Sequence, residues 1–441
     1  MKNRLYAAWD TLRASYWFIP TLMAVTAFAV FLVTVNLDVR YGAEFTRYTS
    51  WLFQNVPDSA RLIFSTIASA VMTVIGVVFS LTMVVLTLTS QQYGPLIVTN
   101  FMRDRGNQFT LGTFTATFIY SLLILRTIRG SVTEGFFIPH ISSLVGFGFA
   151  LASLAILIYF IHHVSMSIQS TEILANISDT LLATIEDVFP QAVGTSASRL
   201  HIPESDLPAN FRDQSQLVRS SYTGYVDYVD TEALFDLTEK HDILLELRYR
   251  PGQFVNAGSV LGVVYPLERA TEELTAAIQA TYIVGNRRTP AQDVEFLIDQ
   301  LVSIATRAMS PAVNDPYTAQ MCLDRLGEGL CKLGNRPLPS ARRYDAAGNL
   351  RMVMGVVSFE NAFYRAFDEI RHYAAHDLAV VMHLLNLFTV IGECVLEEHR
   401  AVILPYTEAV WRECRASLKE DIDLRRLDAA YYHTKHALKA D

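Results

Sequence analysis

Four side chains that could bind a metal ion recur at helical spacing in the C-terminal half of the chain. Asp368, His372, His376 and His383 are separated by steps of four, four and seven residues, which would place them on one face of a helix. Histidine and carboxylate at positions i and i+4 can bind zinc, and Glu369 could serve as a base, although the sequence does not match His-Glu-x-x-His. Two interpretations follow: a membrane-anchored metalloenzyme, or a stripe that faces solvent or an interface. The second is favoured, and no cofactor is predicted.

A second polar group lies in a loop between two helical patterns. Pro311 and Pro316 bracket the pair Asn314 and Asp315, which suits a rigid turn. Asp315 can cap a helix that begins at Pro316, since proline is favoured at the first helical position. Ser310 and Asn314 could add oxygen ligands, but three neighbouring oxygen donors are weak evidence for a metal. The sequence therefore predicts a structural motif first and a ligand site second.

A stripe of small and hydroxylated residues follows one face of a helix without charges. Its members recur at spacings of three, four and seven: Ser65, Ser69, Thr73, Gly76, Ser80 and Thr87. Such a stripe lets transmembrane helices approach closely, which is the simpler interpretation. It could also line a pore in a ring of identical subunits, because hydroxyls hydrate an ion without trapping it. No Asp, Glu or Lys is predicted mid-span, which disfavours a proton relay or a coupled carrier.

The stripe lies on the second of four apolar stretches in the first 163 residues. Each is long enough to cross a bilayer, with spans expected near residues 17–37, 62–90, 108–126 and 141–162. Only 18% of the 441 residues are charged, and the mean hydropathy is +0.24, which excludes a simple cytosolic enzyme. The net charge of −8 argues against a nucleic-acid partner. The lipid bilayer is the expected surrounding.

Four spans place both ends of the chain on the same side of the membrane. Basic residues near the span ends divide evenly, so the positive-inside rule does not choose a side. The N-terminal arm is short and basic, and none of the four cysteines forms a Cys-x-x-Cys pair. These features favour the bacterial inner membrane with both termini in the cytoplasm.

The rest of the chain is expected to be a cytoplasmic α+β region after the α-helical membrane bundle. Residues 164–190 keep apolar three-four spacing, which predicts an amphipathic helix that extends the fourth span. A linker is expected at 191–220. Residues 221–266 read as strands and resemble barrel-sandwich domains, without the Met-Lys-Met hairpin of true carriers. Residues 267–441 predict an α-rich domain interrupted by a hairpin near residue 343.

Several longer motifs resemble a known family. They are Phe79–Pro95, Phe101–Gln108, Tyr159–Val164 and Ser310–Ala319. With them the chain resembles an uncharacterised family of bacterial predicted integral membrane proteins, defined as a domain of unknown function. That family commonly has an arginine where Leu96 stands here. The resemblance implies four spans and a cytoplasmic C-terminal region, and it brings no activity, so no catalytic residue is predicted.

Three functional hypotheses follow from these observations. The leading one is a homo-oligomeric inner-membrane protein whose second span lines a central pathway, with the soluble region as an assembly or gating platform. The alternative is a non-conducting scaffold or sensor that recruits a cytoplasmic protein partner through the α-rich domain. The third is the metalloenzyme that would use the face of His372.

Overall fold

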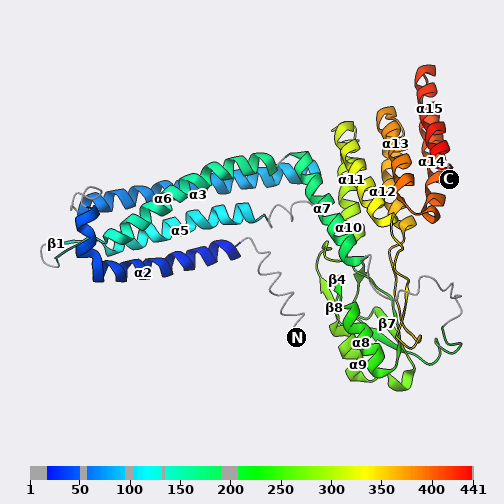
Figure 1. Cartoon of the computed structure of the whole chain (residues 1–441), viewed down its shortest axis with the longest axis horizontal. Helices are drawn as coiled ribbons and strands as arrows, with labels where there is room; N and C mark the ends of the chain where they lie inside the picture. Colours follow the sequence, from blue (N-terminus) through cyan, green and yellow to red (C-terminus); the bar gives the residue numbers. More distant parts are fainter. Residues whose placement is uncertain are drawn as a thin grey trace. The chain divides into compact units, whose positions relative to one another are not determined.

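The structure is a computed structural model that describes residues 17–49, 57–94, 104–131, 135–167, 169–189 and 207–439. The chain divides into two compact units, Met1–Gln169 and Ser170–Asp441. Figure 1 follows the chain from the blue helices of the first unit to the red helices at the C-terminus. The expected class is confirmed: four apolar helices precede a region of small sheets and many helices.

Within the described part of the first unit, four helices are long and apolar enough to span a membrane. A short antiparallel hairpin lies between the third and the fourth. The elements are α2 (Phe18–Thr49), α3 (Pro57–Tyr93), α5 (Arg105–Thr127), β1 (Arg129–Ser131), β2 (Gly135–Phe137) and α6 (His140–Ser167).

Helix α5 is the centre of this bundle. It contacts α2, α3 and α6, and 61% of its apolar window is buried, against 17–22% for the other three. Phe114, Tyr120 and Ile124 of α5 are almost completely buried, as is Phe64 of α3. The three outer helices therefore each leave a broad apolar face uncovered by this chain, as expected for helices that meet lipid or another copy.

Two boundaries differ from the sequence-based prediction. Helix α2 continues to Thr49 instead of ending near residue 37, which places Asp38 inside the helix. The predicted continuous helix through 164–190 is also wrong, because α6 ends at Ser167 and a separate helix, α7 (Ser170–Val188), begins three residues later. Helix α6 is apolar on all sides and α7 has an apolar face at three-four spacing, so apolar residues continue from one helix to the other and the pattern does not indicate the short break.

The helical part of the second unit consists of α7 and three helical hairpins. The helices of the hairpins are α10 (Val294–Ala308), α11 (Pro316–Gly334), α12 (Phe359–Ala374), α13 (Leu378–Cys394), α14 (Glu397–Ser417) and α15 (Asp421–Ala437). Helix α7 packs its buried face, which includes Ile177 and Leu181, against α10 and α11. A Cβ on Gly329 would lie 2.5 Å from Leu181 Cδ2, so the absent side chain permits this close approach.

The remaining described elements of the second unit are two sheets, two α-helices and the 3-10 helix Leu267–Arg269. The strands are β3 (Gln216–Arg219), β4 (Gly224–Val229), β5 (Leu244–Leu247), β6 (Phe254–Val255), β7 (Val260–Tyr265), β8 (Tyr282–Gly285), β9 (Arg342–Tyr344) and β10 (Leu350–Val353). The helices are α8 (Thr231–His241) and α9 (Glu272–Ala280). The sheet orders are β3-β7-β5-β10-β9 and β6-β4-β8.

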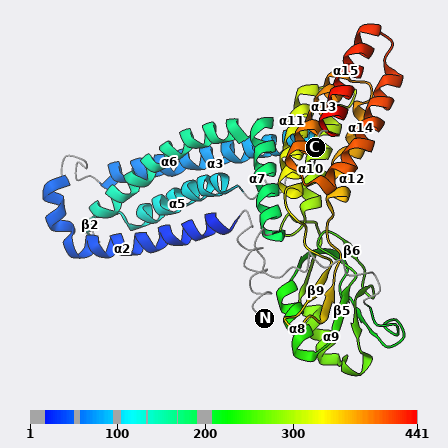
Figure 2. The same cartoon turned by 45° about the vertical axis from the view of Figure 1, so that its right-hand side comes forward.

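The five-stranded sheet has two apolar faces because side chains alternate along each strand. On one face, Leu245 and Val264 join a core with Leu234 of α8 and Ile278 of α9; Figure 2 shows both helices beside the strands. On the other face, Leu244 belongs to a smaller cluster with Phe211 and Leu350, among others.

The prediction of an isolated β module at 221–266 needs correction. Strands β3, β8, β9 and β10 lie outside that range yet belong to the same sheets, and α8 lies inside it. Strand β10 pairs in parallel with β5, with Met352 opposite Leu245. A local pattern carries no signal for a pairing between residues about a hundred positions apart. Of the predicted linker at 191–220, residues 191–206 lie outside the described residues and β3 occupies part of the rest.

Candidate functional site

The hydroxylated stripe lies on the outer surface of the membrane unit. All six members are exposed in this chain: Ser65, Ser69, Thr73, Gly76, Ser80 and Thr87. At 100° per residue they occupy an arc of about 80°. The residues of α3 that pack inward, including Phe64, Val71 and Val78, lie on the opposite side of the helix. The stripe therefore does not take part in packing within the bundle.

The two threonine hydroxyl groups of this stripe have partners on their own helix. Thr73 Oγ1 donates to the carbonyl oxygen of Ser69 at 3.0 Å, and Thr87 Oγ1 donates to that of Met83 at 2.9 Å. A Cβ added to Gly76 would meet no atom within 4 Å. Back-bonded threonines can face an apolar neighbour without an unsatisfied donor, so this surface suits contact with another helix as well as water.

A buried carboxylate that sequence analysis missed joins α2 to α6. Asp38 is 4% exposed. Its carboxylate accepts hydrogen bonds from the backbone N–H of Ile141 at 2.6 Å and of Ser142 at 2.8 Å, and from Ser142 Oγ at 2.6 Å. Asp38 thus satisfies the free N–H groups at the start of α6. The sequence signal was present, since an acid next to an apolar window needs a partner, but no spacing rule identifies α6 as that partner.

Polar side chains of α5 hold the bundle together from its centre. Tyr120 Oη is hydrogen-bonded to Thr34 Oγ1 of α2 at 2.9 Å and donates to the carbonyl oxygen of Ser142 at 3.1 Å. Thr117 Oγ1 and Ser153 Oγ of α6 are 2.7 Å apart. Hydrogen bonds between helices are the main polar contacts available where water is absent. The apolar interior of the single bundle therefore also contains hydrogen bonds between helices, and these are distinct from the outer stripe.

Two of the motifs that resemble the family are in contact at the N-terminal end of α5. His163 Nε2 is 2.7 Å from Asp104 Oδ2, and Asp104 also caps α5 by accepting from the N–H of Gly106 at 2.6 Å. A Cβ on Gly106 would lie 2.6 Å from His163 Nε2. The motifs Phe101–Gln108 and Tyr159–Val164 thus share one contact, between Asp104 and His163.

Removal of this contact has a measurable consequence. We expect Asp104→Ala to destabilise the membrane unit by about 1–2 kcal/mol, because it removes both the helix cap and the partner of His163. Asp104→Asn retains the capping oxygen and should cost roughly half as much. Unfolding in increasing concentrations of SDS, followed by circular dichroism, measures both variants. Equal stabilities of the alanine variant and the parent would contradict the assigned role.

The four side chains that could bind a metal ion, Asp368, His372, His376 and His383, do not lie close together. The helix that was expected to carry them breaks between α12 and α13, and His376 lies exposed in that turn. The other three contact different partners. His372 Nδ1 is 3.0 Å from Glu413 Oε1, His383 Nε2 is 2.7 Å from Asp324 Oδ1, and Asp368 accepts from Tyr406 Oη at 2.9 Å.

The cause of this correction is a helix cap. Asp377 accepts from the N–H of Val380 at 3.1 Å and starts α13, so the spacing of the stripe spans two helices. In the part of the chain that the structure describes, no three potential ligands come close enough to hold a metal ion. The metalloenzyme hypothesis required these side chains to lie on one helical face, and they do not.

The loop around Asp315 is a helix start, as expected. Asp315 accepts from Thr318 N at 3.1 Å and from Thr318 Oγ1 at 2.6 Å, and Pro316 is at the first position of α11. Asn314 has a positive φ of 49°, and its N–H donates to the carbonyl oxygen of Ser310 at 2.9 Å. Ser310, Pro311 and Asn314 therefore shape the turn of the α10–α11 hairpin.

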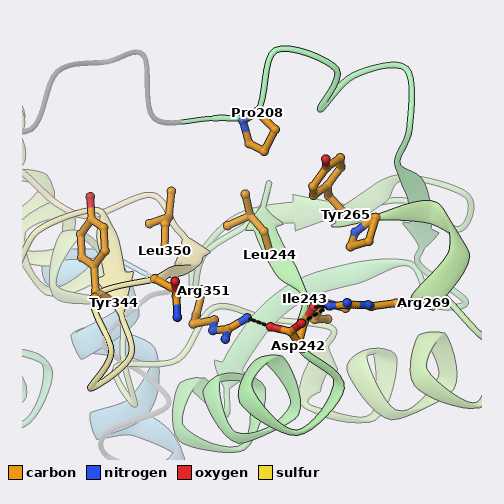
Figure 3. Close-up of a pocket in the computed structure, with 12 residues that line it drawn as sticks. Pro208, Asp242, Ile243, Leu244, Tyr265, Arg269, Tyr344, Leu350 and Arg351 are labelled. Atoms are coloured by element: carbon orange, nitrogen blue, oxygen red, sulfur yellow. Dashed lines mark hydrogen bonds and ion pairs between the residues drawn. The ribbon is translucent and has the colours of Figure 1, made fainter.

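A pocket of about 610 Å³ opens on the second face of the five-stranded sheet. Figure 3 shows Leu244 and Leu350 in its apolar part, below Pro208. At one end Asp242 forms ion pairs with Arg351, at 2.5 Å, and with Arg269. These arginines lower the pKa of the exposed Asp242 carboxyl. Asp242 directly follows α8, so its ion pair with Arg351 connects the end of this helix to strand β10.

The charges around this pocket balance. Asn349 and Arg351 together lower the pKa of the Asp345 carboxyl to about 2, and Arg351 Nε lies 2.7 Å from Asp345 Oδ2. Two arginines are thus matched by two ionised aspartates near neutral pH. The pocket thus combines an apolar sheet face with arginine side chains that are paired with aspartates. No spacing or motif in the sequence indicates a role for these residues.

Comparison with known proteins identifies the family to which the chain belongs. Residues 13–389 match the family described as predicted membrane protein (DUF2254). The chain is 30% identical over 429 residues to uncharacterised proteins of Mycobacterium bovis and Mycobacterium tuberculosis, covering 96% of this chain and 80% of each relative. No solved structure matches it. With its four apolar helices and this match over most of its length, the chain belongs to the DUF2254 family of predicted membrane proteins.

Proposed function

We propose that copies of this chain assemble in the membrane through the outer stripe of α3 and that this stripe lines a pathway between them. The observation that carries the proposal is the exposure of all six stripe residues on the side of α3 opposite to α5. Small residues permit close approach of helices, and hydroxyls can hydrate a passing ion. The proposal places the protein in the bacterial inner membrane with both termini in the cytoplasm. Four spans put the two termini on the same side, and the basic N-terminal arm favours the cytoplasmic side.

The second unit would act as the assembly or gating platform. Helix α7 follows α6 after only two residues, and its apolar face is buried against α10 and α11. A short connection between a span and a packed helix limits how far one can move without the other. This supports a role for the second unit in holding or moving the fourth span.

A non-conducting scaffold is the second candidate, and a specific observation favours it. The threonine hydroxyls of the stripe already donate to carbonyl oxygens of α3, so the stripe can be buried against a neighbouring helix with no water. In that case the assembly would present several copies of the second unit to a protein partner.

Ion flux into liposomes separates the two candidates. Purified full-length protein should be oligomeric by light scattering and should conduct monovalent ions, and Ser69→Leu or Ser80→Leu should reduce the flux at least tenfold by blocking the lined pathway. Ala152→Leu, at an exposed position of α6, is the matched control and should leave the flux unchanged.

The other outcomes decide between the hypotheses. An oligomer that conducts nothing, and that the leucine variants dissociate, would favour the scaffold over the pathway. A monomeric parent protein would contradict both, because neither a pathway nor a multivalent platform can form from one copy.

A further inference from the structure

Two of the four cysteines lie together where α11 and α13 end. Cys331 is one turn before the end of α11, Cys394 is the last residue of α13, and the Cys394 side chain lies near enough to the Cys331 thiol to influence its pKa. The backbone segments next to them are also in contact, since the N–H of Leu396 donates to the carbonyl oxygen of Gly334 at 2.9 Å. A Cβ on Gly334 would lie 2.5 Å from Val395 Cγ1, so the close approach depends on a residue without a side chain.

The two sulfur atoms differ in their exposure to solvent. Cys394 is exposed and Cys331 is half-buried, whereas Cys322 and Cys414 are completely buried elsewhere in the unit. Burial, and next the contact with Cys394, raise the pKa of the Cys331 thiol to about 12. Cys394 is therefore the thiol that a reagent in solution can reach first, and Cys331 is held protonated beside it.

We propose that Cys331 and Cys394 are a modification site that forms a reversible intramolecular disulfide with a small-molecule disulfide as oxidant. A disulfide requires two backbone segments that are held close together, and the hydrogen bond from Leu396 N to the Gly334 carbonyl oxygen holds these two helix ends in that way. No other pair among the described cysteines has such a contact. The bond would close the loop that contains α12 and α13 and so fix the two helix ends to each other.

The reaction proceeds in two exchange steps. The Cys394 thiolate attacks one sulfur of glutathione disulfide, which forms a mixed disulfide and releases one glutathione. The Cys331 thiol then gives up its proton and attacks Cys394 Sγ, which releases the second glutathione. Two protein thiols are oxidised to one disulfide, and one glutathione disulfide is reduced to two glutathione molecules. Excess dithiothreitol reverses both steps.

Peptide mapping of the full-length protein in detergent tests this proposal. The reduced protein is treated with excess glutathione disulfide, the remaining thiols are alkylated after unfolding, and the peptides are analysed by mass spectrometry. We expect a Cys331–Cys394 cross-link, with Cys322 and Cys414 alkylated. The cross-linked protein should unfold about 5 °C higher than the reduced one, because the closed loop restricts the unfolded chain.

Serine variants identify the order of attack. Cys331→Ser should stop at the mixed disulfide on Cys394, and Cys394→Ser should leave Cys331 unmodified. Cys414→Ser is the matched control and should cross-link like the parent. A parent protein that keeps both thiols free, or that accumulates the mixed disulfide on Cys394 without closure, would overturn the proposal even if a variant fails to fold.

Discussion

Replacing Asp38 by alanine should destabilise the membrane unit by about 3 kcal/mol. The carboxylate accepts three hydrogen bonds at the N-terminus of α6, two of them from backbone N–H groups. Without it, these N–H groups stay inside the bundle with no acceptor from α2, and each such group costs about 1–3 kcal/mol. The removal of a buried charge offsets part of this loss.

A local measurement separates this effect from general destabilisation. Hydrogen exchange of the full-length protein in detergent should be accelerated at least tenfold in the peptide that contains Ile141 and Ser142. Asp38→Asn retains one acceptor oxygen and should have a smaller effect. Asp58→Ala is the control, because the Asp58 side chain is 87% exposed at the start of α3. Unchanged exchange in Asp38→Ala would show that α6 does not depend on this cap.

The features that the sequence predicted depend on residues close together in the chain. The apolar windows of the four spans are continuous, so their length alone indicates a membrane helix. The cap at Asp315 is equally local, since its acceptor and its donor at Thr318 are three residues apart. Asp38 is different, because its partner at Ser142 is 104 residues away and no short-range pattern connects them.

In the candidate site, too, the sequence predicts local features but not the contacts between distant residues. Helical spacing correctly places the stripe from Ser65 to Thr87 on one face of α3, but only packing shows that this face points away from α5. The spacing of His372 and His383 suggested one face as well, and it failed because a cap at Asp377 ends one helix and starts another. The pocket beside Asp242 depends on the parallel pairing of β5 with β10, which a sequence pattern does not contain.

The loop between β5 and β6 contains a glycine whose replacement should have a comparably large effect on the second unit. Gly252 has a φ of 89°, and a Cβ there would overlap the carboxylate of Asp293. Asp293 is 3% exposed, caps α10 through Phe296 N at 3.0 Å, and pairs with Arg288 at 2.8 Å. We expect Gly252→Ala to cost about 4 kcal/mol, from backbone strain and from displacement of this buried ion pair.

A second glycine in the same part of the chain separates these two causes. Gly258 has almost the same φ, 88°, but a Cβ there would meet no atom within 4 Å. Gly258→Ala should therefore cost only the strain of the left-handed conformation, about 1 kcal/mol. Guanidinium unfolding of both variants, measured by tryptophan fluorescence, gives the difference. If the two alanine variants lose equal stability, the contact between Gly252 and Asp293 does not hold the loop against α10. If only Gly252→Ala is severe, the buried Asp293–Arg288 pair requires a residue without a side chain beside it.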